Sequence, residues 1–199
     1  MNRRAKSCIA ATALTLVSFA AQADGDAARG AKLAYACLGC HGIEYYKNAY
    51  PKYSVPKLGG QNRAYIVAAL SEYKAGARWH PTMRGYATEL SDQDRADLAA
   101  YFNAAAPKVS TAEPVGTPPE KAAPCVACHG KNGVGTMDEY PNLAGQHADY
   151  VAQALNDYRL GKRKNPLMQP FAQQLSQDDI RALAKFFSAQ KGLETPKHD

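Results

Sequence analysis

Two short strings of the sequence, CLGCHG and CVACHG, each place two cysteines three positions apart, with a histidine directly after the second cysteine. This C-x-x-C-H pattern is the attachment signature of a c-type haem, in which the two thiols add to the haem vinyl groups and the histidine binds the iron. The sequence therefore predicts two covalently bound haem c groups. Their attachment residues are Cys37, Cys40 and His41 for the first haem, and Cys125, Cys128 and His129 for the second.

Three other uses of the cysteine pairs explain the sequence less well. A redox dithiol of the thioredoxin type needs alternating strands and helices, whereas this chain shows helical patterns only. A structural zinc site usually has its two cysteine pairs about 15–20 residues apart. Here the pairs begin at positions 37 and 125, which are 88 residues apart. Disulfides within each pair, the default for an exported chain, leave the repeated histidine without a purpose.

A haem iron that is bound by histidine on one face needs a ligand on the other, and two methionines are placed to supply it. Met83 and Met168 match each other in the two halves of the chain, and each follows a proline by two residues. A thioether sulfur is a neutral ligand that raises the haem potential. We expect both methionines to lie in loops and to be the second axial ligands, with simple packing as the alternative.

Two neighbouring residues are weaker candidates for this ligand position. His80 stands close to Met83, but Asn165 occupies the matching place in the second half, so we expect His80 to be a surface residue. Met137 has no counterpart in the first half and follows the second haem box too closely.

The two halves of the chain are copies of one unit. When residues 56–104 are shifted by 85 positions, 20 of the 49 residues are identical, and the cysteine boxes recur at an offset of 88. Such a repeat predicts two copies of one supersecondary unit. Each copy holds only about 80 residues, a thin core that a bulky apolar group such as haem would complete.

Both copies follow a helical pattern. Apolar residues recur at helical spacing over 65–73 and 150–158, and a glycine follows each run. Ser91 and Ser176 each precede an acidic residue by three positions, which is a helix-start signal. The first copy also predicts a leading helix over 27–37. Because no alternating strand pattern is present, the expected fold class is all-α.

The sequence divides into four parts. Residues 1–23 have the features of an export signal, namely a basic start, an apolar run and a small-residue cleavage site. Residues 24–106 form the N-terminal unit, and residues 121–199 form the C-terminal unit. The proline-rich stretch 107–120 is the linker between them. We expect the polar tail from Lys191 onward to fray.

The net charge of the chain gives little information about its binding partners. The chain carries a formal charge of +6, and removal of the signal with its three basic residues leaves 21 basic and 18 acidic residues, or +3. The basic residues are scattered among acidic ones, which gives no basis for nucleic-acid binding. The small surplus favours acidic partner surfaces only mildly.

These motifs resemble a known family. Each half is similar to a class I cytochrome c domain in its C-x-x-C-H-G box, its P-x-L-x-G-Q string, its Y-x-x-G-x-R helix end, its P-x-M string and its L-S-x-x-D helix start. The tandem arrangement resembles the dihaem cytochrome c4 family over nearly all of residues 24–190. The resemblance implies two class I cytochrome c-like helical domains that pack face to face on the side of the haem propionates. Arg78 and Arg163, which match in the repeat, are candidates to bind these propionates, with solvated arginines beside helix ends as an equal alternative.

The resemblance also implies an electron carrier of the bacterial periplasm, either free or membrane-associated. It would take electrons from a quinol:cytochrome c oxidoreductase and pass them to a haem-copper terminal oxidase. With both axial positions of each iron filled, neither haem has an open position for a substrate, so no catalytic residue is expected. Two alternatives stay open: a cytochrome subunit with a flavoprotein partner in a sulfide dehydrogenase, and a dihaem oxidoreductase of peroxidase or thiosulfate-oxidising type.

Two places depart from the family's pattern. After the first box, a segment with four tyrosines over 45–53 replaces the glycine-rich turn that follows the second box. We expect these tyrosines to pack as a lid over the first haem rather than to form a docking surface. The approach to Cys125 is short and rich in proline, which leaves little room for a leading helix in the second unit.

Overall fold

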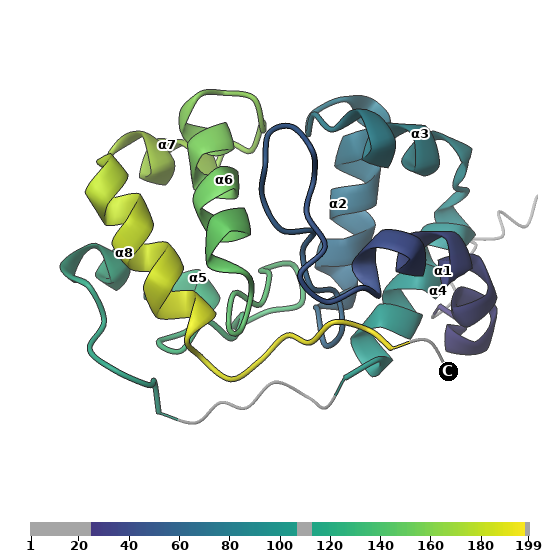
Figure 1. Ribbon diagram of the computed structural model, residues 1–199, viewed down its shortest axis with the longest axis horizontal. Coiled ribbons are helices and arrows are strands. Elements are labelled where there is room, and N and C mark those ends of the chain that lie inside the picture. The colour runs from purple at the N-terminus through teal and green to yellow at the C-terminus, as the bar shows by residue number, and fades with distance from the viewer. Residues whose placement is uncertain (1–24, 107–112, 198–199) are drawn as a thin grey trace, which may run out of the picture.

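The computed structural model describes residues 25–106 and 113–197, so the expected export signal and the first part of the linker lie outside it. The described residues form helices joined by turns and isolated bridges, which confirms the all-α class. Figure 1 shows two helical groups side by side, which we call the first domain (α1–α4) and the second domain (η1 and α5–α8). The elements are α1 Ala27–His41, α2 Arg63–Ala75, α3 Pro81–Glu89, α4 Asp92–Ala104, the 3₁₀ helix η1 Glu120–Cys125, α5 Val126–His129, α6 Ala148–Arg159, α7 Met168–Gln173 and α8 Gln177–Ser188.

The first domain is built on the crossing of α1 and α4. Gly30 allows a close approach of the two helices, because a Cβ atom there would lie 2.1 Å from the carbonyl oxygen of Asp97. Arg29 of α1 forms ion pairs with both Asp94 and Asp97 of α4. The expected leading helix is confirmed, and it continues to His41, so the first haem box forms its last turns.

The second domain has no counterpart of α1 among the described residues. Its chain reaches the second box through η1, which contains Pro124, and through the single turn of α5. Proline removes a backbone donor and clashes with the preceding turn, which is why a long helix does not form here. The expected lack of room for a leading helix is therefore confirmed. The buried cluster of this domain is small and consists of Ala122, Leu183, Phe186 and Phe187.

The predicted helix ends agree with the structure. Gly76 follows α2 in the left-handed conformation, with a φ of 75°, and Gly161 (φ 70°) lies two residues beyond the end of α6. Ser91 and Ser176 each form a complete capping box at the start of α4 and α8. The repeat is thus present in the local hydrogen bonds as well as in the sequence.

The C-terminal segment does not fray over its described residues, so this expectation was wrong. It runs back across the bottom of the molecule to the first domain, as the yellow trace in Figure 1 shows. Glu194 exchanges two backbone hydrogen bonds with Gly59 of the first domain, at 3.0 and 3.1 Å. Leu193 and Pro196 are buried, and this apolar burial offsets the entropy that a free tail would keep. The segment therefore ties the two domains together.

None of the helices in 25–106 and 113–197 is long and apolar enough to cross a membrane. The domain limits expected from the sequence stay a prediction.

Candidate functional site

The histidines of the two boxes are buried and oriented in the same way. His41 is the last residue of α1, and His129 is the last residue of α5. The Nδ1 atom of His41 lies 2.8 Å from the carbonyl oxygen of Pro56, and that of His129 lies 3.0 Å from the carbonyl oxygen of Pro141. A carbonyl only accepts, so each Nδ1 carries the proton and each Nε2 keeps its lone pair. This is the arrangement that metal-binding histidines show, and it fits a haem iron at Nε2.

The four cysteines of the boxes are half-buried free thiols in the structure. Burial is the main cause that raises the pKa of the Cys37 and Cys125 thiols, so neither site is built to stabilise a reactive thiolate. In α1, Cys37 and His41 are four residues apart and share one helix face. The thiols and the imidazole are thus presented from one side, as a covalently attached haem requires.

The two methionines lie at matched places, although not in loops as expected. Met83 is in the first turn of α3, and Met168 is the first residue of α7. Pro81 begins α3, because its fixed φ suits the first helical position and its missing N–H is not needed there. Both methionines are half-buried. The short helices that carry them had no clear apolar period from which the sequence could predict them.

The residue three positions before each methionine holds its backbone. Asn165 Oδ1 accepts hydrogen bonds from the N–H groups of Leu167 and Met168, both at 3.0 Å. His80 is the N-cap of α3, and its Nδ1 accepts a hydrogen bond from the Met83 N–H at 3.3 Å. His80 is half-buried, so the description as a surface residue was wrong. Sequence reasoning missed this role because His80 and Asn165 are chemically different, although both can accept a hydrogen bond.

Arg78 and Arg163 meet where the two domains touch. They form an isolated antiparallel bridge with each other, and the Lys164 N–H donates to the Ala77 carbonyl at 2.8 Å. Each arginine is only 5% exposed. The alternative of solvated arginines beside helix ends was therefore wrong.

Around the two guanidinium groups lie tyrosines and one paired carboxylate. Arg163 donates to the Tyr65 hydroxyl at 2.9 Å, and Arg78 forms an ion pair with Glu72 at 2.8 Å. Burial alone would raise the pKa of Tyr65, but Arg163 and Arg78 lower it to about 8. The arginines also lie over aromatic rings, Arg78 at 5.0 Å from the Tyr73 centroid and Arg163 at 4.4 Å from that of Tyr158.

This cluster has an excess of positive charge, because its two guanidinium groups share one paired carboxylate. The Nε atoms of Arg78 and Arg163 are buried and have no hydrogen-bond partner among the described residues. Asp157 matches Glu72 in the repeat but accepts from Gln153 at 2.8 Å, and no ion pair joins it to Arg163 in the described part of the chain. Buried guanidinium groups with free donors suit carboxylates, and haem carries two propionate carboxylates. The cluster therefore fits the group that the boxes predict.

Two glutamines join the domains in a symmetric way. Gln61 exchanges hydrogen bonds with the backbone N–H and carbonyl of Asn142, at 2.8 and 3.0 Å. Gln146 does the same with the backbone of Lys57, at 3.0 Å for both bonds. The four residues match in pairs under the shift of 85 positions. The identity of the two glutamines in the repeat was the signal that could have revealed this contact.

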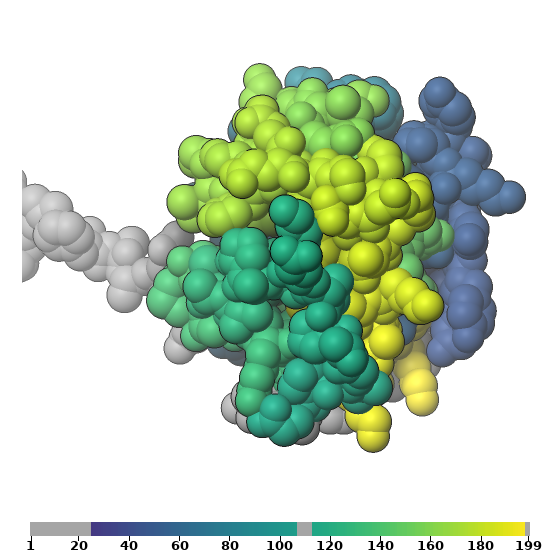
Figure 2. All heavy atoms as spheres, turned by 90° about the vertical axis from the view of Figure 1, so that its left-hand side faces the viewer, coloured from purple at the N-terminus to yellow at the C-terminus, as the bar shows by residue number. Residues whose placement is uncertain are grey.

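The tyrosine segment, residues 43–55, bridges the two domains, and the expected lid over the first haem stays a prediction. Ser54 donates from its N–H and its hydroxyl to Asp149 of α6, at 3.0 and 2.9 Å, and the Tyr53 ring lies 6.2 Å from the Tyr150 ring. Tyr45 and Tyr50 are 78% and 95% exposed. In Figure 2 the blue atoms of this part of the chain stand out to the right of the second domain. The segment thus combines a packed base with exposed aromatic rings.

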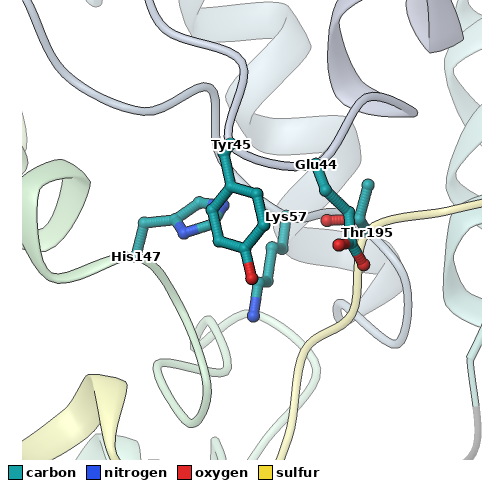
Figure 3. Close-up of a pocket in the computed structure, with 5 residues that line it drawn as sticks. All are labelled: Glu44, Tyr45, Lys57, His147 and Thr195. Carbon is teal, nitrogen blue, oxygen red and sulfur yellow. The ribbon is translucent and has the colours of Figure 1, made fainter.

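A cavity of about 110 Å³ lies behind this segment (Figure 3). Glu44, Tyr45 and Lys57 of the first domain line it together with His147 of the second domain and Thr195 of the C-terminal segment. Its volume is well below the several hundred Å³ that a drug-sized ligand needs. It is therefore a polar crevice at the domain boundary and not a cofactor pocket.

Comparison with known proteins gives consistent matches. Residues 27–105 match the family model described as "Cytochrome c", and residues 121–187 match "Cytochrome C oxidase, cbb3-type, subunit III". The chain is 37% identical to cytochrome c4 of Pseudomonas aeruginosa, over 94% of this chain and 98% of the relative. It is 36% identical to the thiosulfate dehydrogenase electron acceptor of Stutzerimonas stutzeri, over 78% of this chain and 79% of the relative. The crystal structure of reduced recombinant cytochrome c4 from Pseudomonas stutzeri superposes with a TM-score of 0.67 at 33% identity, over 83% of this chain and 99% of that chain.

Proposed function

The chain belongs to the cytochrome c4 family, and from this premise we propose that it is a periplasmic carrier that shuttles single electrons between respiratory partners. As a member of this family it binds two covalent haem c groups and transfers electrons with redox partners. In our proposal the donor is a quinol-oxidising complex and the acceptor is a terminal oxidase. The chain itself carries out no bond-making reaction.

The proposed roles of the residues follow from the two matched sites. Each haem, when bound, holds or releases one electron at its iron. The cysteines of each box would hold the haem through thioethers, and the box histidine, through Nε2, and the matched methionine would be the two protein ligands of its iron. These residues are Cys37, Cys40, His41 and Met83 in the first domain, and Cys125, Cys128, His129 and Met168 in the second.

The observation that supports a carrier is that both domains present candidate iron ligands, a box histidine and a methionine, at matched positions. Each imidazole is locked through Nδ1, and each methionine backbone is held by the residue three positions before it. A ligand pair held in this way keeps its geometry when the charge of the iron changes. It also leaves neither haem an open position for a substrate, unlike the haem sites that do chemistry.

The arginine cluster supports a route between the two haems. Arg78 and Arg163 come from different domains and meet at the boundary, with buried donors free. We assign them to the haem propionates of the two domains. This arrangement would bring the propionate edges of the haems to the same boundary, so that one electron can pass between domains.

The test of the ligand assignment is the weak near-infrared band of methionine-bound oxidised haem. Met83→Ala and Met168→Ala should each remove about half of this band, because each removes one sulfur from one of two irons. Met137→Ala is the matched control, because Met137 is 52% exposed and lies outside the repeat, and it should leave the band intact. A high-spin haem in the wild-type oxidised protein, or rapid turnover of peroxide, would contradict the carrier proposal.

A second candidate function is that of electron acceptor for a thiosulfate dehydrogenase. It is supported by the 36% identity to a relative with that name over most of both chains. Mixing the oxidised protein with thiosulfate and a purified thiosulfate dehydrogenase should then reduce both haems at a rate similar to turnover. Fast reduction by a quinol-oxidising complex, with no reduction by the dehydrogenase, favours the respiratory assignment instead.

A further inference from the structure

The two domains hold their methionine segments with different side chains at the same position. In the second domain, Asn165 accepts two hydrogen bonds at 3.0 Å, from the N–H groups of Leu167 and Met168. In the first domain, His80 accepts one hydrogen bond at 3.3 Å from the N–H of Met83. A side-chain acceptor at the start of a helix stabilises its first turn. The turn that carries Met83 is therefore held by fewer and longer side-chain hydrogen bonds than the turn that carries Met168.

The ring of His80 is fixed on its other side. Because the Met83 N–H can only donate, Nδ1 of His80 must present a lone pair, and the ring proton is then on Nε2. Nε2 lies 3.3 Å from Oδ1 of Asn48 and donates to it.

Asn48 connects this ring to the tyrosine segment. Its backbone N–H donates to the Tyr53 carbonyl at 2.9 Å, within the turn of the segment. The next residue, Ser54, is bound to Asp149 of the second domain. An unbroken line of contacts thus runs from Met83 through His80 and Asn48 to the domain boundary. Among the described residues, the hydrogen bonds of the Asn165 side chain go to Leu167 and Met168, and none joins it to the segment after the second box.

We propose that His80 is a positioning residue for Met83, and that Asn48 fixes its ring so that the tyrosine segment determines how firmly the first methionine is held. The inference rests on the proposed function, in which Met83 binds the first haem iron. It assigns to the tyrosine segment a role in ligand retention that the second domain does not have.

The test is the replacement of the axial methionine by imidazole in the oxidised, haem-loaded, full-length protein. The measured quantities are the imidazole concentration that half-replaces each methionine and the loss of the near-infrared band. His80→Ala should let imidazole replace Met83 at about fivefold lower concentration, since loss of a helix cap destabilises the ligand-bearing turn. His80→Asn should restore the wild-type value, because Asn165 shows that asparagine can hold this turn.

Two further variants separate the parts of the proposal. Asn48→Ala keeps the hydrogen bond to Met83 and should have a smaller effect of the same sign, about twofold. Asn165→Ala is the matched control and should sensitise the second haem only. Circular dichroism checks that each variant keeps its helices.

The outcomes that overturn the inference differ from those that overturn the ligand assignment. One outcome is that His80→Ala binds imidazole as the wild type does, while Met83→Ala removes half of the near-infrared band. His80 then does not position Met83, and the proposed function still stands. If His80→Asn fails to restore the wild-type value, hydrogen bonding at this position is not the cause. If Met83→Ala keeps the full band, the ligand assignment fails, and this inference fails with it.

Discussion

The two domains carry the same proposed ligand residues in different surroundings. In the first domain the haem box is the end of a fifteen-residue helix, which is tied to α4 by the ion pairs of Arg29 with Asp94 and Asp97. In the second domain the box begins at the last residue of the proline-containing 3₁₀ helix η1 and continues through the single turn of α5. The first haem box is therefore supported by helix packing within the protein, whereas the stability of the second domain depends more on the haem that its box binds.

The surroundings of the sites differ in the same direction. The first box is followed by the tyrosine segment, which reaches across to α6, whereas the second is followed by a tight glycine turn. A Cβ atom on Gly133 would come within 2.8 Å of the Ala144 nitrogen, so this position of the turn has no room for a side chain. The two copies thus share the proposed ligand residues and differ in the segments that surround them.

The largest expected effect is on folding without haem. Cys125→Ala/Cys128→Ala should remove about 5 kcal/mol or more from the free energy of unfolding of the second domain, enough to unfold a small domain. Cys37→Ala/Cys40→Ala should leave α1 packed on α4 and cost the first domain less. Amide hydrogen exchange measures both losses of stability. It is followed in α6 and α8 for the Cys125/Cys128 variant and in α2 and α4 for the Cys37/Cys40 variant. Equal loss of protection in the two domains would show that α1 does not compensate for haem.

The next effect isolates α1, which has no counterpart in the described part of the second domain. Asp97 is buried and accepts hydrogen bonds from the Asp26 N–H at 2.7 Å and from Gln93 at 2.8 Å, besides its pair with Arg29. Asp97→Ala leaves these donors without an acceptor and should lower the free energy of unfolding by about 3 kcal/mol. The second domain has Ala182 at the matching position. Asp178→Ala, which breaks an ion pair with Arg181 that is exposed on both sides, is the control and should cost less than about 1 kcal/mol in the same denaturant titration.

Sequence periodicity and capping signals were sufficient for most of the fold. The helices α2, α4, α6 and α8 follow apolar spacing and local start and stop residues, which act over a few positions. The C-terminal segment was misjudged because its order comes from pairing with Gly59, which is more than 130 residues away in the chain. The polarity of the segment itself cannot predict a pairing partner that is so distant in the sequence.

For the candidate site, residue types were predictable and their surroundings were not. The boxes and the matched methionines follow from spacing. Burial of Arg78 and Arg163 depends on how the two domains dock, which no single repeat specifies. The role of His80 also required the structure, because histidine can bind metal, accept a hydrogen bond or face solvent, and only its contacts with Met83 and Asn48 decide among these.

A smaller effect tests the symmetry of the domain contact. Gln61→Ala and Gln146→Ala each remove two hydrogen bonds to the partner domain's backbone, and each should lower the free energy of unfolding by about 2 kcal/mol. The two losses should agree within about 0.5 kcal/mol, because the contacts match. Denaturant unfolding followed by circular dichroism gives both values. A large loss for one variant and none for the other would mean that the two contacts do not form an equivalent pair.

The smallest effect concerns the tyrosine segment and depends on pH. Burial alone would raise the pKa of Asp149, but the hydrogen bonds from Ser54 and the contact with Lys47 lower it overall. A carboxyl whose pKa is lower in the folded state stabilises the fold above its unfolded value of about 4, and this stabilisation is lost as the pH falls through the folded value. Asp149→Asn should therefore cost about 1 kcal/mol at pH 7, and the difference from wild type should shrink below pH 4.

Ser54→Ala provides the matched control for this carboxylate. It removes the hydroxyl donor but keeps the backbone N–H of Ser54 on Asp149, so it should cost about half as much at pH 7. Free energies of unfolding from denaturant titrations between pH 3 and pH 7 measure the difference for each variant. Because His147 interacts electrostatically with both Asp149 and Glu44, the wild-type curve alone cannot assign the effect, and the variant-minus-wild-type difference is the quantity that decides. If the difference for Asp149→Asn stays constant between pH 3 and pH 7, the charge of Asp149 does not hold the tyrosine segment to the second domain. The asymmetry between the domains would then rest on the packing of Tyr53 against Tyr150.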